Sequence, residues 1–117
     1  MEHTITKYGN LIIVALTGDV DLEYSPGLRD ALLDNVGKAD GIVVDLSGVI
    51  MIDSSGIASL LEAFQMSRKR GKGFILADVG EPVMKVLKLA RLETVFEIAD
   101  DVQTARQAMA WICFQAK

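Results

Sequence analysis

The stretch that decides the fold runs from residue 41 to residue 57 and reads Gly-Ile-Val-Val-Asp-Leu-Ser-Gly-Val-Ile-Met-Ile-Asp-Ser-Ser-Gly-Ile. Its nearly all-apolar beginning, residues 41–45, predicts a short strand buried at the centre of a sheet. After a connection through Ser47 and Gly48, the Asp-Ser-Ser-Gly segment at 53–56 predicts the opening of a helix. A buried strand that leads into a helix is the repeating unit of α/β domains.

Upstream of this stretch, two short runs predict a β-hairpin. Residues 4–7 alternate polar and apolar side chains, Tyr8-Gly9-Asn10 predicts a turn, and residues 11–16 are rich in β-forming side chains. Gly18 is expected to end the second strand, and residues 19–21 are expected to leave it as a loop.

Capping signals and apolar spacing predict the helices. Ser25 is expected to be the N-cap of the first helix, with Pro26 at its first position and Gly37 after its end. The second helix is expected to end with the basic residues 68–70, which favour the negative end of the helix dipole and are interpreted as a helix end rather than a ligand patch. The remaining elements are expected to be a strand at 74–77, a helix at 81–89, a strand at 95–98 and a terminal helix from Asp101.

The resulting order is β-β-α-β-α-β-α-β-α. Strands that alternate with helices pair in parallel through right-handed crossovers, and the hairpin adds one antiparallel pair. The sequence therefore predicts a single α/β domain over residues 1–117. Its mixed central sheet is expected to have about five strands, accompanied by about four helices.

Composition excludes several classes of function. The 117 residues are 50% hydrophobic, which is enough for the core of one domain. The formal net charge of −4 argues against a nucleic-acid partner, because phosphate binding needs a basic surface. No apolar run approaches the roughly 20 residues that span a bilayer, and the N-terminus does not resemble a secretory signal. A cytoplasmic location without membrane insertion is expected, and the single cysteine, Cys113, is expected to be packed.

Common catalytic residue sets are missing. His3 is the only histidine, and Ile52 stands where a G-x-S-x-G elbow needs glycine. One cysteine and one histidine cannot make a zinc site. Gly71-Lys72-Gly73 lacks the earlier glycine and the Ser/Thr of a phosphate-binding loop. The chain is therefore not expected to be an enzyme, and no cofactor or metal is predicted.

The Asp-Ser-Ser-Gly segment has both a structural and a functional interpretation. Asp53 or Ser54 is expected to cap the helix, and Gly56 to allow tight packing. A hydroxyl at a helix N-terminus is also a place where an added phosphate is tolerated, because free N–H groups and the positive dipole end face it. Phosphorylation there adds roughly −1.5 to −2 charges without unfolding the domain. From the residues alone, both interpretations stay open.

Residues 45–56, Asp-Leu-Ser-Gly-Val-Ile-Met-Ile-Asp-Ser-Ser-Gly, closely resemble the signature of STAS domains, and specifically of anti-sigma factor antagonists. Residues 16–21, Leu-Thr-Gly-Asp-Val-Asp, resemble the Gly-Glu-Leu-Asp turn of that family, although Asp19 replaces the usual glutamate. Leu28-Arg29 lies in a helix similar to the one that follows this turn in the family.

The resemblance implies partner switching. The unphosphorylated protein is expected to bind an anti-sigma factor that is also a serine kinase of the histidine-kinase-like ATPase fold. Ser55 is the implied phosphoacceptor, Asp53, Ser54 and Gly56 shape the acceptor loop, and Asp21 lies beside the acceptor and contacts the kinase. ATP and magnesium would belong to the kinase, and a serine phosphatase would restore binding. Asp21 also has an ordinary interpretation as a turn residue.

Two alternatives stay open at this point. One is a STAS adaptor of a transporter or signalling scaffold that is never phosphorylated. The other is a receiver domain with Asp45 as its acceptor, although Asp19 and Asp21 are poor candidates for its acidic pair and residues 77–80 lack its lysine. Residues 49–51 can either pack inward or offer an apolar rim to a partner. The sequence also leaves a homodimer open, which exposure of Trp111 and Phe114 would favour.

Overall fold

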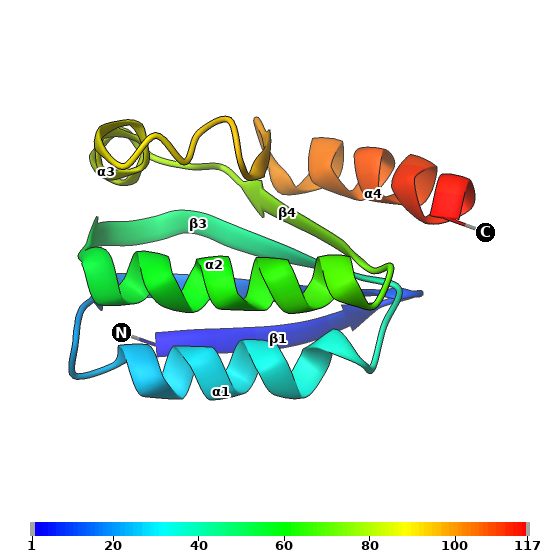
Figure 1. Ribbon diagram of the computed structural model, residues 1–117, viewed down its shortest axis with the longest axis horizontal. Helices are drawn as coiled ribbons and strands as arrows, with labels where there is room; N and C mark the ends of the chain where they lie inside the picture. The colour runs from blue at the N-terminus through cyan, green and yellow to red at the C-terminus, as the bar shows by residue number, and fades with distance from the viewer. Residues whose placement is uncertain (1, 117) are drawn as a thin grey trace.

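The protein, analysed as a computed structural model that describes residues 2–116, with side chains up to Met109, forms one five-stranded sheet with four helices (Figure 1). The elements, in order, are β1 Glu2–Tyr8, β2 Leu11–Val20, α1 Ser25–Val36, β3 Gly41–Ile52, α2 Ser54–Lys69, β4 Gly73–Ala77, α3 Glu81–Leu89, β5 Glu97–Ala99 and α4 Val102–Ala116. The spatial order of the strands is β1-β2-β3-β4-β5, with β1 antiparallel to β2 and the other pairs parallel. This confirms the predicted mixed sheet and its order of elements.

The alternation of side chains along the central strands divides the core into two layers. Residues such as Val14, Val44 and Leu76 pack on one face against α1, α2 and α3. Their neighbours Val43 and Ile75 point to the other face, where α4 covers them with Ala105 and Met109. α1 and α2 lie side by side across the first face (Figure 1). Burial on both faces explains why the sequence of β3 begins as a continuous apolar run.

Two strands extend beyond their predicted ends. β2 continues to Val20 and does not stop at Gly18, and β3 continues to Ile52 through the predicted connection at Ser47 and Gly48. The two strands stay paired across register shifts, which absorb the irregular residues as bulges. Gly48 is needed for the close approach of the strands, since a Cβ there would lie 2.7 Å from Thr17 Cγ2. The glycine therefore marks a bulge, not a turn.

Two smaller predictions were also wrong. Tyr24, not Ser25, is the N-cap of α1, because Ser25 is already helical and buried, with its amide bonded to the Asp21 carbonyl at 2.9 Å. The last strand is Glu97–Ala99 and not residues 95–98, because the amides of Val95 and Phe96 bond to Leu92 in a turn. The side chains of Trp111, Cys113 and Phe114 lie outside the described residues.

No helix within residues 2–116 is both long enough and apolar enough to cross a membrane.

Candidate functional site

Ser55 lies in the first turn of α2, at the edge of the sheet where β2 and β3 end. The amide of Asp53 donates to the carbonyl of Val20 at 3.0 Å, which ties the start of α2 to the end of β2. Ser55 is half-buried and Ser54 is exposed. The structure therefore leaves the Ser55 side chain partly exposed at the end of the molecule, and does not enclose it in the core.

Asp53 is the N-cap of α2, which decides between the two capping residues that the sequence left open. Its Oδ1 accepts bonds from the amides of Ser55 and Gly56, both at 3.0 Å, and from the Ser55 hydroxyl at 2.5 Å. The Ser55 hydroxyl, together with the amides of Gly56, Ser55 and Leu22, holds the pKa of the Asp53 carboxyl below its ordinary value. The carboxylate thus binds both amides and the hydroxyl that the first turn of α2 presents to it.

This geometry corrects one part of the sequence argument. The sequence predicts free N–H groups at this helix N-terminus without naming them, and in the structure the carboxylate of Asp53 already accepts the amides of Ser55 and Gly56. A phosphate on Ser55 would meet a carboxylate that is bonded to the same hydroxyl oxygen. The positive end of the α2 dipole would therefore be shared between two anions.

Gly56 has a packing role. A Cβ on this residue would lie 2.7 Å from both Ile52 Cγ1 and Val20 Cγ1, closer than real contacts allow. Glycine lets the first turn of α2 rest directly on β2 and β3, which confirms the interpretation as a tight-packing residue.

Asp21 begins the connection from β2 to α1. Its Oδ1 accepts the amides of Glu23 and Tyr24 at 3.1 and 3.4 Å, and its carbonyl accepts the amide of Ser25 at 2.9 Å. These are the bonds of a turn residue, as the ordinary interpretation expects. Because Asp21 follows Val20, the fold also brings it to the same edge as Asp53. The two aspartates therefore lie on neighbouring connections.

Exposed hydrophobic side chains border this edge. Ile50 and Met51, near the end of β3, are 69% and 49% exposed, whereas Val49 is buried. Leu22 and Tyr24, on the adjacent connection, are 73% and 40% exposed. We call Leu22, Tyr24, Ile50 and Met51 the apolar rim. The sequence left open whether the side chains of residues 49–51 point inward or outward. It did not identify Leu22 or Tyr24 as surface residues of the site, because two apolar side chains in a loop are the only local indication of such a role.

Asp45 lies inside β3 and not at its end. It is paired with Ala15 of β2 and Ala77 of β4, and its Oδ1 accepts the amide of Ser47 at 3.0 Å. Among the described residues, no three His, Cys, Asp or Glu side chains come together as a metal site. Asp45 therefore does not occupy the strand-end position that the receiver alternative requires.

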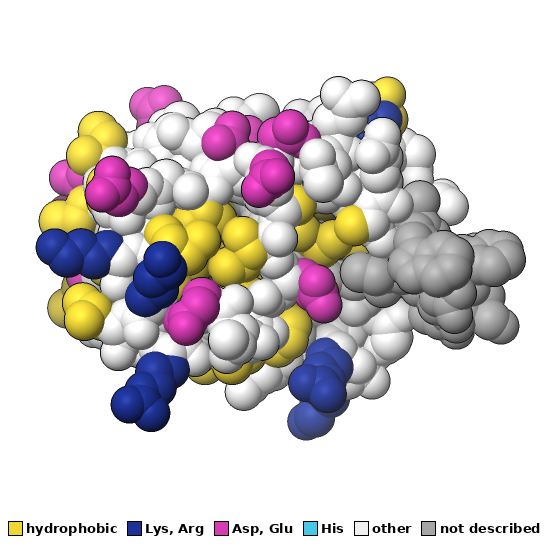
Figure 2. Space-filling model, turned by 90° about the horizontal axis from the view of Figure 1, so that it is seen from above, with side chains coloured by type: hydrophobic (Ala, Val, Ile, Leu, Met, Phe, Trp, Pro, Cys, Tyr) yellow, Lys and Arg dark blue, Asp and Glu magenta, His cyan; other side chains and the backbone are white. Residues whose placement is uncertain are grey.

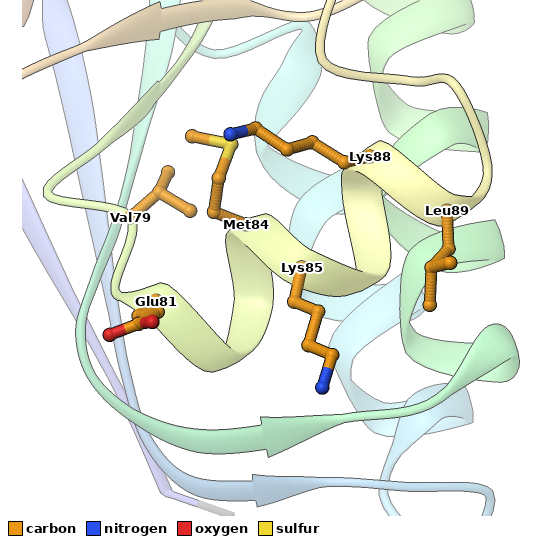
Figure 3. Close-up of a pocket in the computed structure, with 6 residues that line it drawn as sticks. All are labelled: Val79, Glu81, Met84, Lys85, Lys88 and Leu89. Atoms are coloured by element: carbon orange, nitrogen blue, oxygen red, sulfur yellow. The ribbon is translucent and has the colours of Figure 1, made fainter.

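A second surface feature lies on α3, at the same end of the molecule as the start of α2 (Figure 1). A shallow hollow of about 540 Å³ is lined by Val79, Met84 and Leu89 together with charged side chains of the helix (Figure 3). Met84 and Lys88 point to one side of α3, and Lys85 and Leu89 point to the other (Figure 3). On the face that carries α3 and α4, hydrophobic side chains gather at the centre, with acidic and basic ones around them (Figure 2).

The fold, together with the Asp-Ser-Ser-Gly segment at the start of α2, defines a class of protein. Comparison with known proteins identifies the family. The profile of the STAS domain family matches residues 3–105, and the chain belongs to this family. Within the family, the chain is similar to anti-sigma factor antagonists. It is 26% identical over 103 residues to the anti-sigma F factor antagonist of Paenibacillus polymyxa, covering 86% of this chain and 85% of that protein.

Two solved structures show the same fold. An anti-sigma factor antagonist from Mycobacterium paratuberculosis superposes with a TM-score of 0.86 at 22% identity, covering 93% of each chain. The Bacillus cell fate determinant SpoIIAA, in its phosphorylated form, superposes with a TM-score of 0.73 at 15% identity, covering 92% of this chain and 99% of that one.

Proposed function

We propose that the chain is an anti-sigma factor antagonist that acts by partner switching. In its unphosphorylated state it binds an anti-sigma factor that is also a serine kinase of the histidine-kinase-like ATPase fold, and so frees the sigma factor. Transfer of phosphate to Ser55 ends this binding, and a serine phosphatase restores it. ATP and magnesium belong to the kinase.

The observation that carries the proposal is the position of Ser55. Its half-buried side chain lies in the first turn of α2, next to the β2–α1 and β3–α2 connections. The four side chains of the apolar rim are between 40% and 73% exposed. A partner that covers the rim buries apolar surface, which is the main favourable contribution to most protein association. The similarity to the antagonist of Paenibacillus polymyxa supports the partner class, and SpoIIAA is a relative in fold with a phosphorylated form.

Phosphate on Ser55 would oppose docking in two ways. It places a doubly charged, strongly hydrated group at the edge of an apolar contact, where removing it from water is costly. It also competes with Asp53 for the helix end, where the Asp53 carboxylate accepts the amides of Ser55 and Gly56. In this proposal Asp53, Ser54, Gly56 and Asp21 shape the docking edge.

The test is recovery of partners from the native lysate with wild type, Ser55→Ala and Ser55→Asp, together with intact-mass analysis. Ser54→Ala is the matched control for the phosphoacceptor, because it removes the exposed neighbouring hydroxyl and leaves Ser55 in place; its mass should still show added phosphate, whereas the mass of Ser55→Ala should not. We expect Ser55→Ala to retain an ATPase-fold partner and Ser55→Asp to lose it. Equal recovery by all variants, with no phosphate in the wild type, would instead identify an unphosphorylated adaptor.

A further inference from the structure

A second site lies at the opposite end of β3 from Ser55. Three connections meet there: the β1–β2 turn, the α1–β3 connection and the α2–β4 connection, all at the right-hand end of Figure 1. Backbone hydrogen bonds join them, since the amide of Asp40 donates to the carbonyl of Asn10 at 2.8 Å and the amide of Gly73 donates to the carbonyl of Asp40 at 3.0 Å. The three connections therefore form one preorganised surface.

This surface encloses a polar hollow of about 230 Å³. Three lysines line it: Lys7 near the end of β1, Lys38 in the α1–β3 connection and Lys72 in the α2–β4 connection. Asp40 is the one carboxylate among the lining residues, and it lies 3.7 Å from the Lys72 ammonium. We call this the basic hollow. Its volume is below that of pockets for drug-sized ligands and suits a smaller group.

The basic hollow has a net positive charge, whereas the chain as a whole has a net negative charge. The protein has sixteen acidic and twelve basic residues, yet the lining has three lysines to one carboxylate. Arg70 adds a further positive charge, because its Nη1 lies against Gly37, 2.8 Å from where a Cβ would be. The cations of the hollow repel one another locally, and a bound anion would relieve this repulsion.

Helix dipoles explain the positions of only some of these basic side chains. Lys38 follows the C-terminal end of α1 and Arg70 is the C-cap of α2, where positive side chains are favourable. Lys72 also belongs to the end of α2, because its amide donates to the Ser67 carbonyl at 2.8 Å. Lys7 lies on β1 and belongs to no helix end. The position of Lys7 beside the basic side chains of two helix ends has no local signal in the sequence, where only residues 68–70 form a basic run.

We propose that the basic hollow binds a phosphate-bearing small ligand, either a free phosphate compound or the headgroup of an anionic lipid. Lysine ammonium groups bind phosphate as compact point charges. Gly9 and Gly37 line the hollow without side chains, which lets an anion approach the backbone. The site lies the length of β3 away from Ser55, and the proposal does not depend on phosphorylation of that residue.

The test titrates the 117-residue chain with sodium pyrophosphate at low ionic strength, with sodium chloride at matched ionic strength as the salt control. Amide NMR shifts report the position of binding, and calorimetry reports the affinity. We expect saturable shifts at Gly9, Lys38 and Ala39 that chloride does not reproduce. Removing one lysine should weaken binding about tenfold, as expected for one charge-assisted contact to phosphate. A parallel arm measures co-sedimentation with phosphatidylglycerol vesicles and with phosphatidylcholine vesicles.

The variant pair is Lys7→Gln with Lys72→Gln, and the control pair is Lys85→Gln with Lys88→Gln on α3, which removes the same charge elsewhere. Binding of pyrophosphate that only the first pair weakens supports a free ligand. Binding only to phosphatidylglycerol vesicles, lost in the first pair, supports a lipid headgroup. Equal loss in both pairs, or no saturable binding in either arm, would overturn the proposal. Ser55→Ala should bind like wild type, which separates this result from the proposed function.

Discussion

The hydroxyl of Ser55 donates to Oδ1 of Asp53 at 2.5 Å, and the same carboxylate oxygen caps α2 through the amides of Ser55 and Gly56. One oxygen therefore serves both the helix end and the proposed phosphoacceptor. A change in the charge or bonding of either side chain alters the hydrogen bonding of the other, because they share this bond.

Replacing Asp53 with alanine should lower the melting temperature by about 5 °C, because an N-cap that bonds two amides is lost. The substitution Asp53→Asn keeps a side-chain oxygen that can cap, so this variant should lose much less. Thermal unfolding followed by circular dichroism measures both. Equal losses in the two variants would mean that the charge of Asp53, not its capping bonds, sets the stability.

The stability of the protein at low pH should depend on the Asp53 carboxylate. The fold lowers the pKa of Asp53 below its ordinary value of 3.8, first through the Ser55 hydroxyl and then through the Gly56 amide. The unfolded chain therefore binds the proton more readily than the folded one. The stabilisation is present in full above the unfolded value and is lost as the pH falls through the lower, folded value. Urea midpoints of wild type and Asp53→Asn should converge below pH 3.8, and a constant difference across that range would contradict this assignment.

Phosphate at Ser55 should loosen the start of α2. Phosphoserine incorporated at position 55 during expression would place a second anion against Asp53, and hydrogen exchange at the amides of Ser55 and Gly56 should accelerate. Phosphoserine at position 54 is the control, since Ser54 makes no bond to Asp53 among the described contacts. If both sites changed exchange equally, the shared oxygen would not be the cause.

Gly56→Ala should destabilise the protein by about 1–3 kcal/mol, because the added methyl overlaps Ile52 and Val20. Gly27→Ala provides the matched control within a helix. Nothing lies within 4 Å of a Cβ at Gly27, so that change should stabilise α1 by about 0.5–1 kcal/mol. Urea denaturation of both variants tests the opposite signs.

The apolar rim should contribute to the affinity for the partner but not to the stability of the fold. Ile50→Asp introduces a charge at a residue that is 69% exposed, so folding should be unaffected while recovery of the partner falls. Val95→Asp is the control, because Val95 is 42% exposed and lies beside Arg68, at the opposite end of α2 from Ser55. Equal partner recovery by both variants would place the docking surface elsewhere.

Most of the framework could be predicted from local patterns. The apolar run at 41–45 predicted the centre of the sheet, and the spacing of Leu28 and Leu32 marks the buried face of α1. The full lengths of β2 and β3 could not be predicted, because Ser47 and Gly48 resemble a connection. Only the partner strand, which brings Thr17 against Gly48, shows that the segment is a bulged strand.

The motif at 53–56 predicted the location of the site but not its bonds. Nothing in the order of letters shows that Asp53 occupies the amides of Ser55 and Gly56. Nor does the sequence show that Leu22 and Met51 come to one edge, since this depends on the pairing of β2 with β3. Contacts between residues that are distant in the chain are fixed by the fold and have no local signal.

The prolonged pairing of β2 with β3 has a consequence for how such a protein can diversify. Beyond Asp45 the two strands hold one another through main-chain bonds, while Ile50 and Met51 project into solvent. Those two side chains can be exchanged with little effect on the scaffold, because the backbone that carries them is fixed independently. Duplicated copies of the gene could thus acquire separate binding preferences and avoid cross-talk through a few surface substitutions, each keeping the same serine in the same place.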